Sequence, residues 1–265
     1  MRAALISIAT LLMAACSTAP SNQQAVADLA PTGKLRAAIN VGNAVLAARP
    51  ATPGGEPTGI SVDLARELAR RLGVPLQLVV FDAAGKVVDA GKTGSWDIAF
   101  VALDPKRAAE IAQSPPYVQI EGSYLVKNDS PLKSNDEVDR KGHRVVVGLN
   151  SAYDLYLTRE LKQAQIVRTP TSAQVVDTML KDNYEVSAGV KQALENDARR
   201  LPGVRLLPGR FMVINQAMAS QKGKEAGARY LREFVEEMKA SGFVARAIER
   251  HKQPSAVVAP PGDPQ

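Results

Sequence analysis

The sequence predicts an α/β protein made of two lobes that are connected by two crossing strands. Between residues 34 and 103 the hydrophobic pattern switches repeatedly from period two to period 3.6, which indicates alternating strands and helices. The same alternation starts again at residue 144 and continues to residue 190. Two further apolar stretches, SYLVKN (123–128) and FMVINQAMAS (211–220), flank the second unit and are predicted to cross between the lobes.

The first lobe is predicted to contain three parallel strands. A strand over KLRAAIN (34–40) precedes a helix over SVDLARELARRL (61–72), whose apolar residues share one face and which ends at Gly73. The following strands are VPLQLVVF (74–81) and WDIAFVAL (96–103). Because strand–helix–strand connections are right-handed, these strands are expected to lie side by side in one parallel sheet.

The second lobe repeats this design with different residues. Its predicted strands are RVVVGL (144–149), QIVRT (165–169) and YEVSAGV (184–190). Helical periodicity over residues 152–163 and 172–181 separates them. A second parallel unit is therefore expected.

The N-terminus carries the pattern of an export signal. Arg2 is followed by an apolar run of about a dozen residues, too short for a membrane-spanning helix, which needs about 20. The segment Leu12–Cys16 resembles a bacterial lipobox, which predicts a signal peptide over residues 1–15 and a lipid on Cys16 that anchors the protein to the membrane. Met13 departs from the lipobox pattern, and an ordinary secretory signal with Cys16 incidental is the alternative. Both interpretations place the protein in the periplasm.

Both ends of the chain are predicted to be flexible. Residues 16–32 are small and polar, as in a tether, and residues 253–265 are rich in proline without periodicity. The rest divides into lobe 1, over residues 33–125 and 212–252, and lobe 2, over residues 126–211.

Composition excludes several classes of function. The net charge is +6, but the 33 basic residues are scattered among 27 acidic ones, so no basic stripe for a nucleic acid is expected. One cysteine and two histidines rule out a disulfide scaffold and leave too few ligands for a zinc site. We expect neither a metal nor a cofactor.

The order of four motifs resembles the amino-acid-type extracellular solute-binding proteins of ABC importers. The motifs are GKLRAAIN, GISVDLARELARRLGV, GSWDIAFVALDPKRAAEIAQSPPY and VVVGLNSAYDLYL, and the resemblance covers about residues 33–252. It implies a two-lobed periplasmic-binding-protein fold of type II, the Venus-flytrap fold, with ligand bound between the lobes. It also implies a monomer that delivers a small carboxylate-bearing solute, an amino acid or a related organic acid, to an ABC permease in the inner membrane.

Arg107 is the first candidate ligand-binding residue. In LDPKRAAEI, Asp104 suits a helix N-cap and Pro105 the first helical position, so Arg107 falls in the first turn. A guanidinium at that place presents a fork suited to a carboxylate. By pattern alone, a surface arginine paired with Glu110 or Glu121 is equally open; the resemblance implies that Arg107 holds the carboxylate of the ligand.

Ser151 is the candidate from the other lobe. It is predicted to cap a helix, with Asp154 three residues later in a capping-box pattern. Its hydroxyl and the amides that follow are placed to meet the same ligand, and a purely capping role is compatible with that contact.

Departures from the family pattern indicate the ligand chemistry. Alignment with that pattern places Asn40 where an acidic partner for the ligand ammonium is common, Asn43 where an aromatic lid is common, and Val190 where the main ammonium-binding aspartate stands. Small hydroxyl positions are changed to Phe100 and Ala102. An ammonium buried without a partner costs several kcal/mol. We therefore hypothesise a carboxylate ligand without the usual α-amino anchor, or one held in a different pose.

Two other classes of function remain open from the sequence. Relatives on this scaffold include enzymes of the cyclohexadienyl dehydratase type, but we recognise no catalytic residue in the sequence: it shows no Ser-His-Asp set, metal cluster or phosphate loop. A ligand-presenting sensor is the other class, and no fused signalling domain is expected after Lys252.

Overall fold

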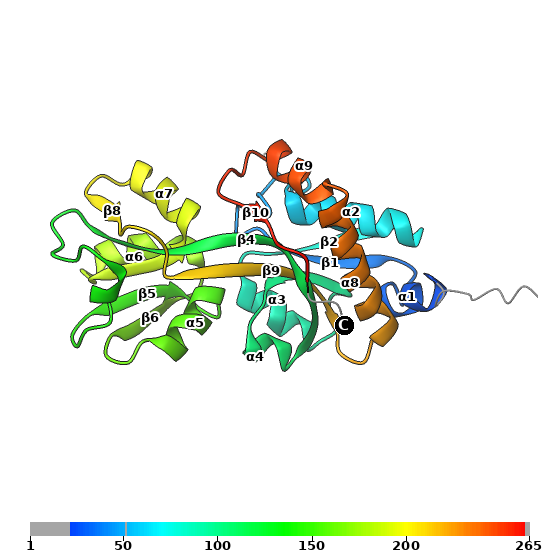
Figure 1. Cartoon of the computed structure of the whole chain (residues 1–265), viewed down its shortest axis with the longest axis horizontal. Helices are drawn as coiled ribbons and strands as arrows, with labels where there is room; N and C mark the ends of the chain where they lie inside the picture. The colour runs from blue at the N-terminus through cyan, green and yellow to red at the C-terminus, as the bar shows by residue number, and fades with distance from the viewer. Residues whose placement is uncertain (1–21, 51, 263–265) are drawn as a thin grey trace, which may run out of the picture.

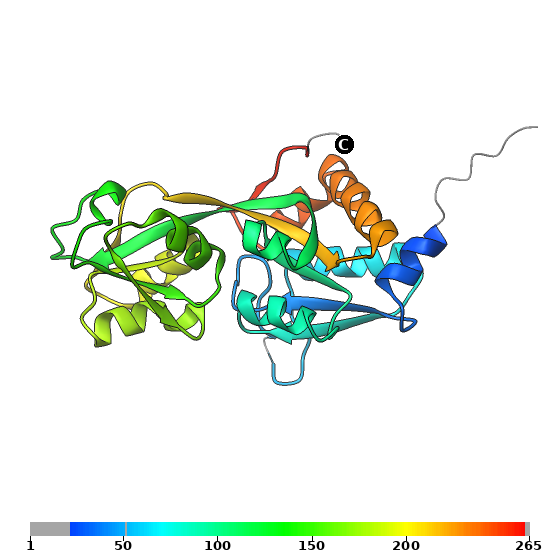
Figure 2. The same cartoon turned by 90° about the horizontal axis from the view of Figure 1, so that it is seen from below.

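The structure, a computed structural model, describes residues 22–50 and 52–262. The predicted signal peptide and Cys16 lie outside the described residues, as do residues 263–265. Two lobes lie side by side, and two long strands bridge them (Figures 1 and 2).

Helices and strands alternate through most of the chain. The helices are α1 (Asn22–Leu29), α2 (Ile60–Leu72), α3 (Ala84–Gly91), α4 (Pro105–Ala108), α5 (Ala152–Glu160), α6 (Val175–Lys181), α7 (Lys191–Arg200), α8 (Glu225–Ala240) and α9 (Phe243–Arg250), with short 3-10 turns η1 (Asn135–Glu137) and η2 (Ser172–Gln174). The strands are β1 (Leu35–Asn40), β2 (Leu76–Phe81), β3 (Ile98–Ala102), β4 (Ile111–Lys127), β5 (Arg144–Gly148), β6 (Gln165–Thr169), β7 (Val186–Val190), β8 (Val204–Leu206), β9 (Met212–Gln221) and β10 (Val257–Val258).

The strands form one continuous sheet that runs through both lobes. Its order is β2-β1-β3-β9-β4-β7-β5-β6, with β8 and β10 paired to β4. In the first lobe β1 is parallel to β2 and β3, and in the second β5 is parallel to β6 and β7. The antiparallel strands β9 and β4 join the two parallel units. The predicted two-lobed α/β fold with two crossing strands is confirmed.

β4 is much longer than the predicted strand over residues 123–128. It pairs with β9 from Ile111 to Gly122 and with β7 and β8 beyond that point, so it belongs to both lobes. Its register with β9 shifts on both sides of Pro116. A proline gives no N–H to a ladder and is tolerated at such an irregularity. The Pro115–Pro116 pair therefore interrupts the sequence pattern of the strand without ending it.

Helices cover both faces of the sheet in each lobe. In the first lobe α2, α8 and α9 lie on one face and α3 on the other (Figure 1). Trp96 anchors the α3 side: it is fully buried, and its Nε1 donates to the carbonyl of Val87 at 2.7 Å. In the second lobe α6 and α7 pack on one face, and α5 packs on the other.

The predicted flexible tether is wrong from residue 22 onward. Helix α1 packs against α8, with Ala25 and Leu29 buried. The backbone N–H of Gly227 donates to Asp28 Oδ2 at 3.0 Å, and a Cβ on Gly227 would lie 2.8 Å from Leu29. The sequence of this helix, NQQAVADL, is short and weakly apolar, and its order comes from the α8 surface on which it packs.

The predicted disordered tail is also wrong over residues 253–262. Val257 and Val258 pair with Gln119 and Val118 of β4, and Ala256 and Ala259 are buried. This order comes from hydrogen bonds to a distant strand, which local periodicity does not reveal. None of the helices in the described ranges combines the length and apolar character needed to cross a membrane.

Candidate ligand-binding cleft

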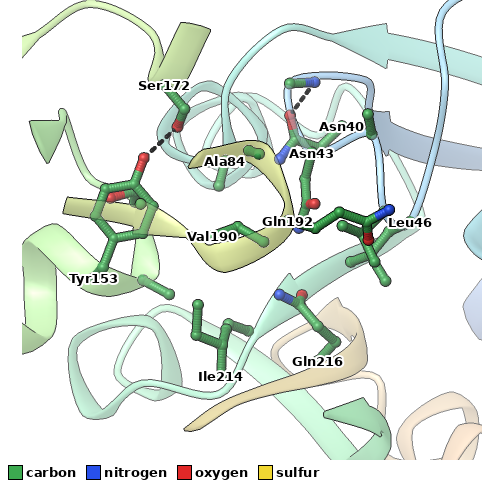
Figure 3. Close-up of a pocket in the computed structure, with 18 of the residues that line it drawn as sticks. Asn40, Asn43, Leu46, Ala84, Tyr153, Ser172, Val190, Gln192, Ile214 and Gln216 are labelled. Atoms are coloured by element: carbon green, nitrogen blue, oxygen red, sulfur yellow. Dashed lines mark hydrogen bonds between the residues drawn. The ribbon is translucent and has the colours of Figure 1, made fainter. Parts of the chain in front are cut away.

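A cavity of about 180 Å³ lies between the lobes (Figure 3). Lobe 1 lines it with the loop after β1, the end of β3 and Arg107, and lobe 2 with the starts of α5 and α7. Ile214 and Gln216 of the crossing strand β9 line it as well. All the ligand-binding residues predicted from the sequence lie on its wall: Asn40, Asn43, Phe100, Ala102, Arg107, Ser151 and Val190.

Arg107 enters the cleft from the short helix α4. Asp104 caps this helix by accepting from the Lys106 N–H at 2.8 Å, and Pro105 occupies its first position. The guanidinium donates through Nη1 to the carbonyl of Ala102 at 3.1 Å and through Nη2 to the carbonyl of Asn150, in the other lobe, at 2.8 Å. The Arg107 Nε is buried and has no hydrogen-bond partner among the described residues.

Burial lowers the pKa of Arg107 without removing its charge at neutral pH. Its side chain is only 2% exposed, and desolvation lowers the pKa of the guanidinium to about 10, which the nearby Asp104 carboxylate partly opposes. It therefore remains protonated at neutral pH. Within the described chain no carboxylate forms an ion pair with Arg107. The two glutamates considered as its partners pair elsewhere, Glu110 with Lys92 and Glu121 with Lys191. The alternative of a surface arginine paired with Glu110 or Glu121 is wrong.

Ser151 caps α5, as predicted. Its Oγ accepts from the backbone N–H of Asp154 at 3.0 Å. The reciprocal contact differs from a capping box, because Asp154 Oδ2 accepts from the N–H of Asn150 at 2.8 Å. Asn150 has a φ of 54°, and Arg168 Nε donates to Asp154 Oδ1 at 2.9 Å. This network fixes the backbone beside the cleft and neutralises the buried Asp154.

The loop after β1 supplies amide side chains. Asn40 Oδ1 accepts from the N–H of Gly42 at 3.0 Å, which leaves its Nδ2 group free of that contact. A Cβ on Gly42 would lie 2.1 Å from the carbonyl oxygen of Asp82, so only glycine fits this tight approach. The side chain of Asn43 follows on the same wall (Figure 3).

Apolar side chains form much of the remaining wall. Phe100 packs edge-to-face on Tyr117, with ring centroids 5.9 Å apart. The Tyr117 hydroxyl lies 3.1 Å from Ser61 Oγ, and burial raises its pKa above the ordinary value. Val190 precedes α7 and offers the helix no side-chain cap. Where the family pattern places an aspartate, the cleft is therefore apolar.

Sequence reasoning missed several lining residues. Tyr153, whose hydroxyl donates to Ser172 Oγ at 2.7 Å, belongs to lobe 2 (Figure 3). Gln192 lies in the first turn of α7, and Gln216 lies in the middle of β9. The one available signal was the pair of amide residues, Asn215 and Gln216, inside the largely apolar stretch 211–220.

The polar lining is mostly neutral. Its amide side chains are those of Asn40, Asn43, Gln192, Asn196, Gln216 and Gln253. The charged lining residues of the described chain are Arg107 and Asp197, and Asp197 Oδ1 lies 2.9 Å from Arg200 Nη2. Over residues 22–50 and 52–262 there is no group of three or more His, Cys, Asp and Glu that could hold a metal ion.

The profile of the bacterial extracellular solute-binding proteins, family 3, matches residues 44–254. The chain belongs to this family. The predicted resemblance and the solute-binding role are confirmed. The L-cystine-binding protein TcyJ of Escherichia coli K12 is 28% identical over 221 residues, which cover 74% of each chain.

Solved structures of similar fold agree with the two-lobed architecture. The solute receptor for L-cysteine of Neisseria gonorrhoeae has a TM-score of 0.74 at 19% identity, covering 87% of this chain and 94% of that chain. An ancestral amino acid-binding protein described as a precursor of cyclohexadienyl dehydratase has a TM-score of 0.70 at 21% identity, covering 83% and 95%. At these identities the likeness concerns the fold alone.

Proposed function

We propose that this solute-binding protein serves an ABC importer and binds a small carboxylate-bearing solute, an amino acid or related organic acid, in the cleft. One observation carries the proposal: Arg107 is a buried cation on the cavity wall, without a carboxylate partner in the described chain and with a free Nε. A buried guanidinium is stabilised by a carboxylate that accepts two hydrogen bonds from it. The names of relatives that bind L-cystine and L-cysteine support the solute class.

Ligand capture follows from how the two lobes meet. The carboxylate binds Arg107 of lobe 1, and the start of α5 beside Ser151 approaches from lobe 2. The structure has the lobes in contact: Arg107 Nη2 reaches the Asn150 carbonyl, and Arg159 Nη1 lies 2.8 Å from Asp104 Oδ2. A ligand that contacts both walls favours this closed state, and the closed protein then docks on the permease.

The apolar Val190 supports a ligand without the usual ammonium anchor. Asp197 is the acidic lining residue of the described chain, and it is paired with Arg200. The same pairing leaves no unpaired carboxylate among the described lining residues to serve as a general acid or base, which favours binding over the dehydratase-like alternative.

Anchoring at the membrane is a separate part of the proposal. We propose that lipidated Cys16 tethers the protein in the periplasm, and Cys16 lies outside the described residues. Labelling of the exported protein with a radioactive fatty acid tests this: wild type takes up label, and Cys16→Ser does not. Equal labelling of both contradicts the anchor.

A thermal-shift panel tests the binding function. The purified protein is heated with amino acids, N-acyl amino acids, hydroxy acids, dicarboxylates and polyamines. A ligand at a hundred times its Kd adds about 2.7 kcal/mol to the free energy of unfolding. We expect shifts from carboxylates that lack a free amino group. A shift from polyamines alone, or no shift from any carboxylate, contradicts the proposed function.

A further inference from the structure

Gln216 presents an amide without a hydrogen-bond partner in the described chain on the wall of the cleft. The residue is 5% exposed and lines the cavity, and its side chain forms no hydrogen bond to another residue of the described chain. In Figure 3 its amide points from β9 into the cavity. The polar atoms of this amide are not among the fully buried atoms that lack a partner, so they keep access to the cavity that they line. Polar groups with little exposure are normally hydrogen-bonded, and the hydrogen-bond partner of the Gln216 amide therefore comes from a molecule within the cavity.

The position of Gln216 relates it to the carboxylate site. β9 runs antiparallel to β3, and Gln216 lies opposite Ala102 in that pairing. Directly opposed residues place their side chains on the same face of the sheet, about 5 Å apart. The carbonyl of Ala102 accepts from Arg107 Nη1. Gln216 therefore lies beside the residue whose carbonyl holds the guanidinium, which would bring its amide close to a ligand whose carboxylate binds Arg107.

The amide of Gln216 forms different hydrogen bonds with the different substituents that a ligand can carry beside its carboxylate. Oε1 accepts hydrogen bonds and Nε2 donates them, so a hydroxyl can use both atoms. An ammonium offers donors only, so it can use Oε1 but not Nε2, and it would add a second positive charge beside the Arg107 cation. The one acidic residue on the described cavity wall, Asp197, is occupied by Arg200. A neutral group that both donates and accepts fits this environment better than a cation does.

We infer that Gln216 is a specificity-determining residue that binds the substituent beside the ligand carboxylate and selects a neutral hydrogen-bonding group, such as a hydroxyl, over an ammonium. The inference rests on the proposed function and names the solute class: hydroxy acids and related neutral-substituted acids rank above the corresponding amino acids.

Two matched ligand triads test the inference. The first is isocaproic acid, its hydroxy analogue leucic acid, and leucine; the second is hydrocinnamic acid, phenyllactic acid and phenylalanine. Titration calorimetry measures the Kd of each for wild type and for Gln216→Met, which keeps the length of the side chain without the amide. Gln221→Met is the control, because Gln221 lies on the same strand outside the cavity wall and donates to the Trp96 carbonyl.

Wild type and the control are expected to bind one or both hydroxy acids about tenfold more tightly than the unsubstituted acid and the amino acid, the effect of one well-made hydrogen bond. Gln216→Met is expected to lose this preference and to keep the affinity of the unsubstituted acid. Tighter binding of the amino acid by wild type, or an unchanged preference in Gln216→Met, overturns the inference while leaving the proposed function intact. Failure of all six acids to bind wild type also overturns it, and the thermal-shift panel then decides separately whether other carboxylates bind. A variant that loses its thermal unfolding transition is replaced by Gln216→Leu.

Discussion

The two lobes hold buried charge beside the cleft in opposite ways. In lobe 2 Asp154, which lies next to the cleft-lining residues 151–153, is 1% exposed, and its carboxylate is satisfied by Arg168 and the backbone of Asn150. On the lobe 1 wall Arg107 is similarly buried, but it has only carbonyl partners and an unused Nε. The contacts of Asp154 hold a loop in place, whereas the charge of Arg107 is left for a bound ligand to neutralise. Burial alone therefore does not distinguish the two residues, and it is the incomplete set of partners that makes Arg107 the candidate for binding.

Removing the unpaired charge should give the largest effect. Arg107→Met is expected to weaken binding of carboxylate ligands about a hundredfold, because charge-assisted hydrogen bonds to a carboxylate contribute about 1.5–3 kcal/mol. The melting temperature of the ligand-free protein should stay the same or rise, because a desolvated cation has been removed. Titration calorimetry measures the affinity for the ligand, and thermal unfolding measures the melting temperature. Lys106→Met, an exposed neighbour on α4, should leave binding unchanged; equal weakening in both variants contradicts the role of Arg107.

Adding a charge to the lobe 2 wall should alter the preference among ligands. Val190→Asp introduces a carboxylate at the N-cap of α7, on the cavity wall. We expect about tenfold tighter binding of amino acids relative to their N-acyl forms, because a desolvated ammonium gains an ionic partner. Val190→Asn is the matched control: it caps the helix equally well but carries no charge. If both variants bind alike, Val190 does not face the ligand ammonium.

Weakening the contact between the walls should have a smaller effect. Arg159→Met removes the ion pair with Asp104 across the lobes. Because the Arg159 side chain is 43% exposed, the pair is worth at most about 1 kcal/mol, so the affinity for ligand should fall by about fivefold or less. Salt should weaken binding by wild type more than binding by this variant. Arg66→Met, whose pairing with Glu56 lies within lobe 1, is the control and should bind as wild type does.

The pH profile should show the smallest change near neutrality. Because the pKa of Arg107 is about 10, binding of a carboxylate should be constant from pH 6 to 9 and fall above about pH 10. The folded pKa lies below the ordinary value of an arginine, so between the two values the folded state holds fewer protons than the unfolded state. This group therefore lowers the free energy of unfolding below pH 10, and the loss is recovered as the pH rises toward the ordinary pKa of arginine. Denaturant titrations of wild type and Arg107→Met check the sign, since the variant should lack this rise.

The sequence predicted the site better on elements with strong local signals than on those without. Asp104 and Pro105 start α4 by local chemistry, and Ser151 starts α5 in the same way, so the sequence alone was enough to place Arg107 and Ser151 at helix starts. Gln216 could not be placed in this way, because strand periodicity shows that a residue alternates but not which strand lies beside it. Whether these residues bind the ligand stays a prediction for the binding experiments.

The sequence by itself determined the two α/β lobes and the crossing strands, because hydrophobic period and caps are local properties of the chain, whereas the neutral residues expected in the cleft were placed there by the family resemblance. The tertiary structure decided that Arg107 lacks a carboxylate partner, that Gln216 lies beside Ala102, and that residues 22–29 and 253–262 are ordered on α8 and β4. Each of these depends on contacts between residues far apart in the chain, whose free energy exists only once the lobes have folded and met.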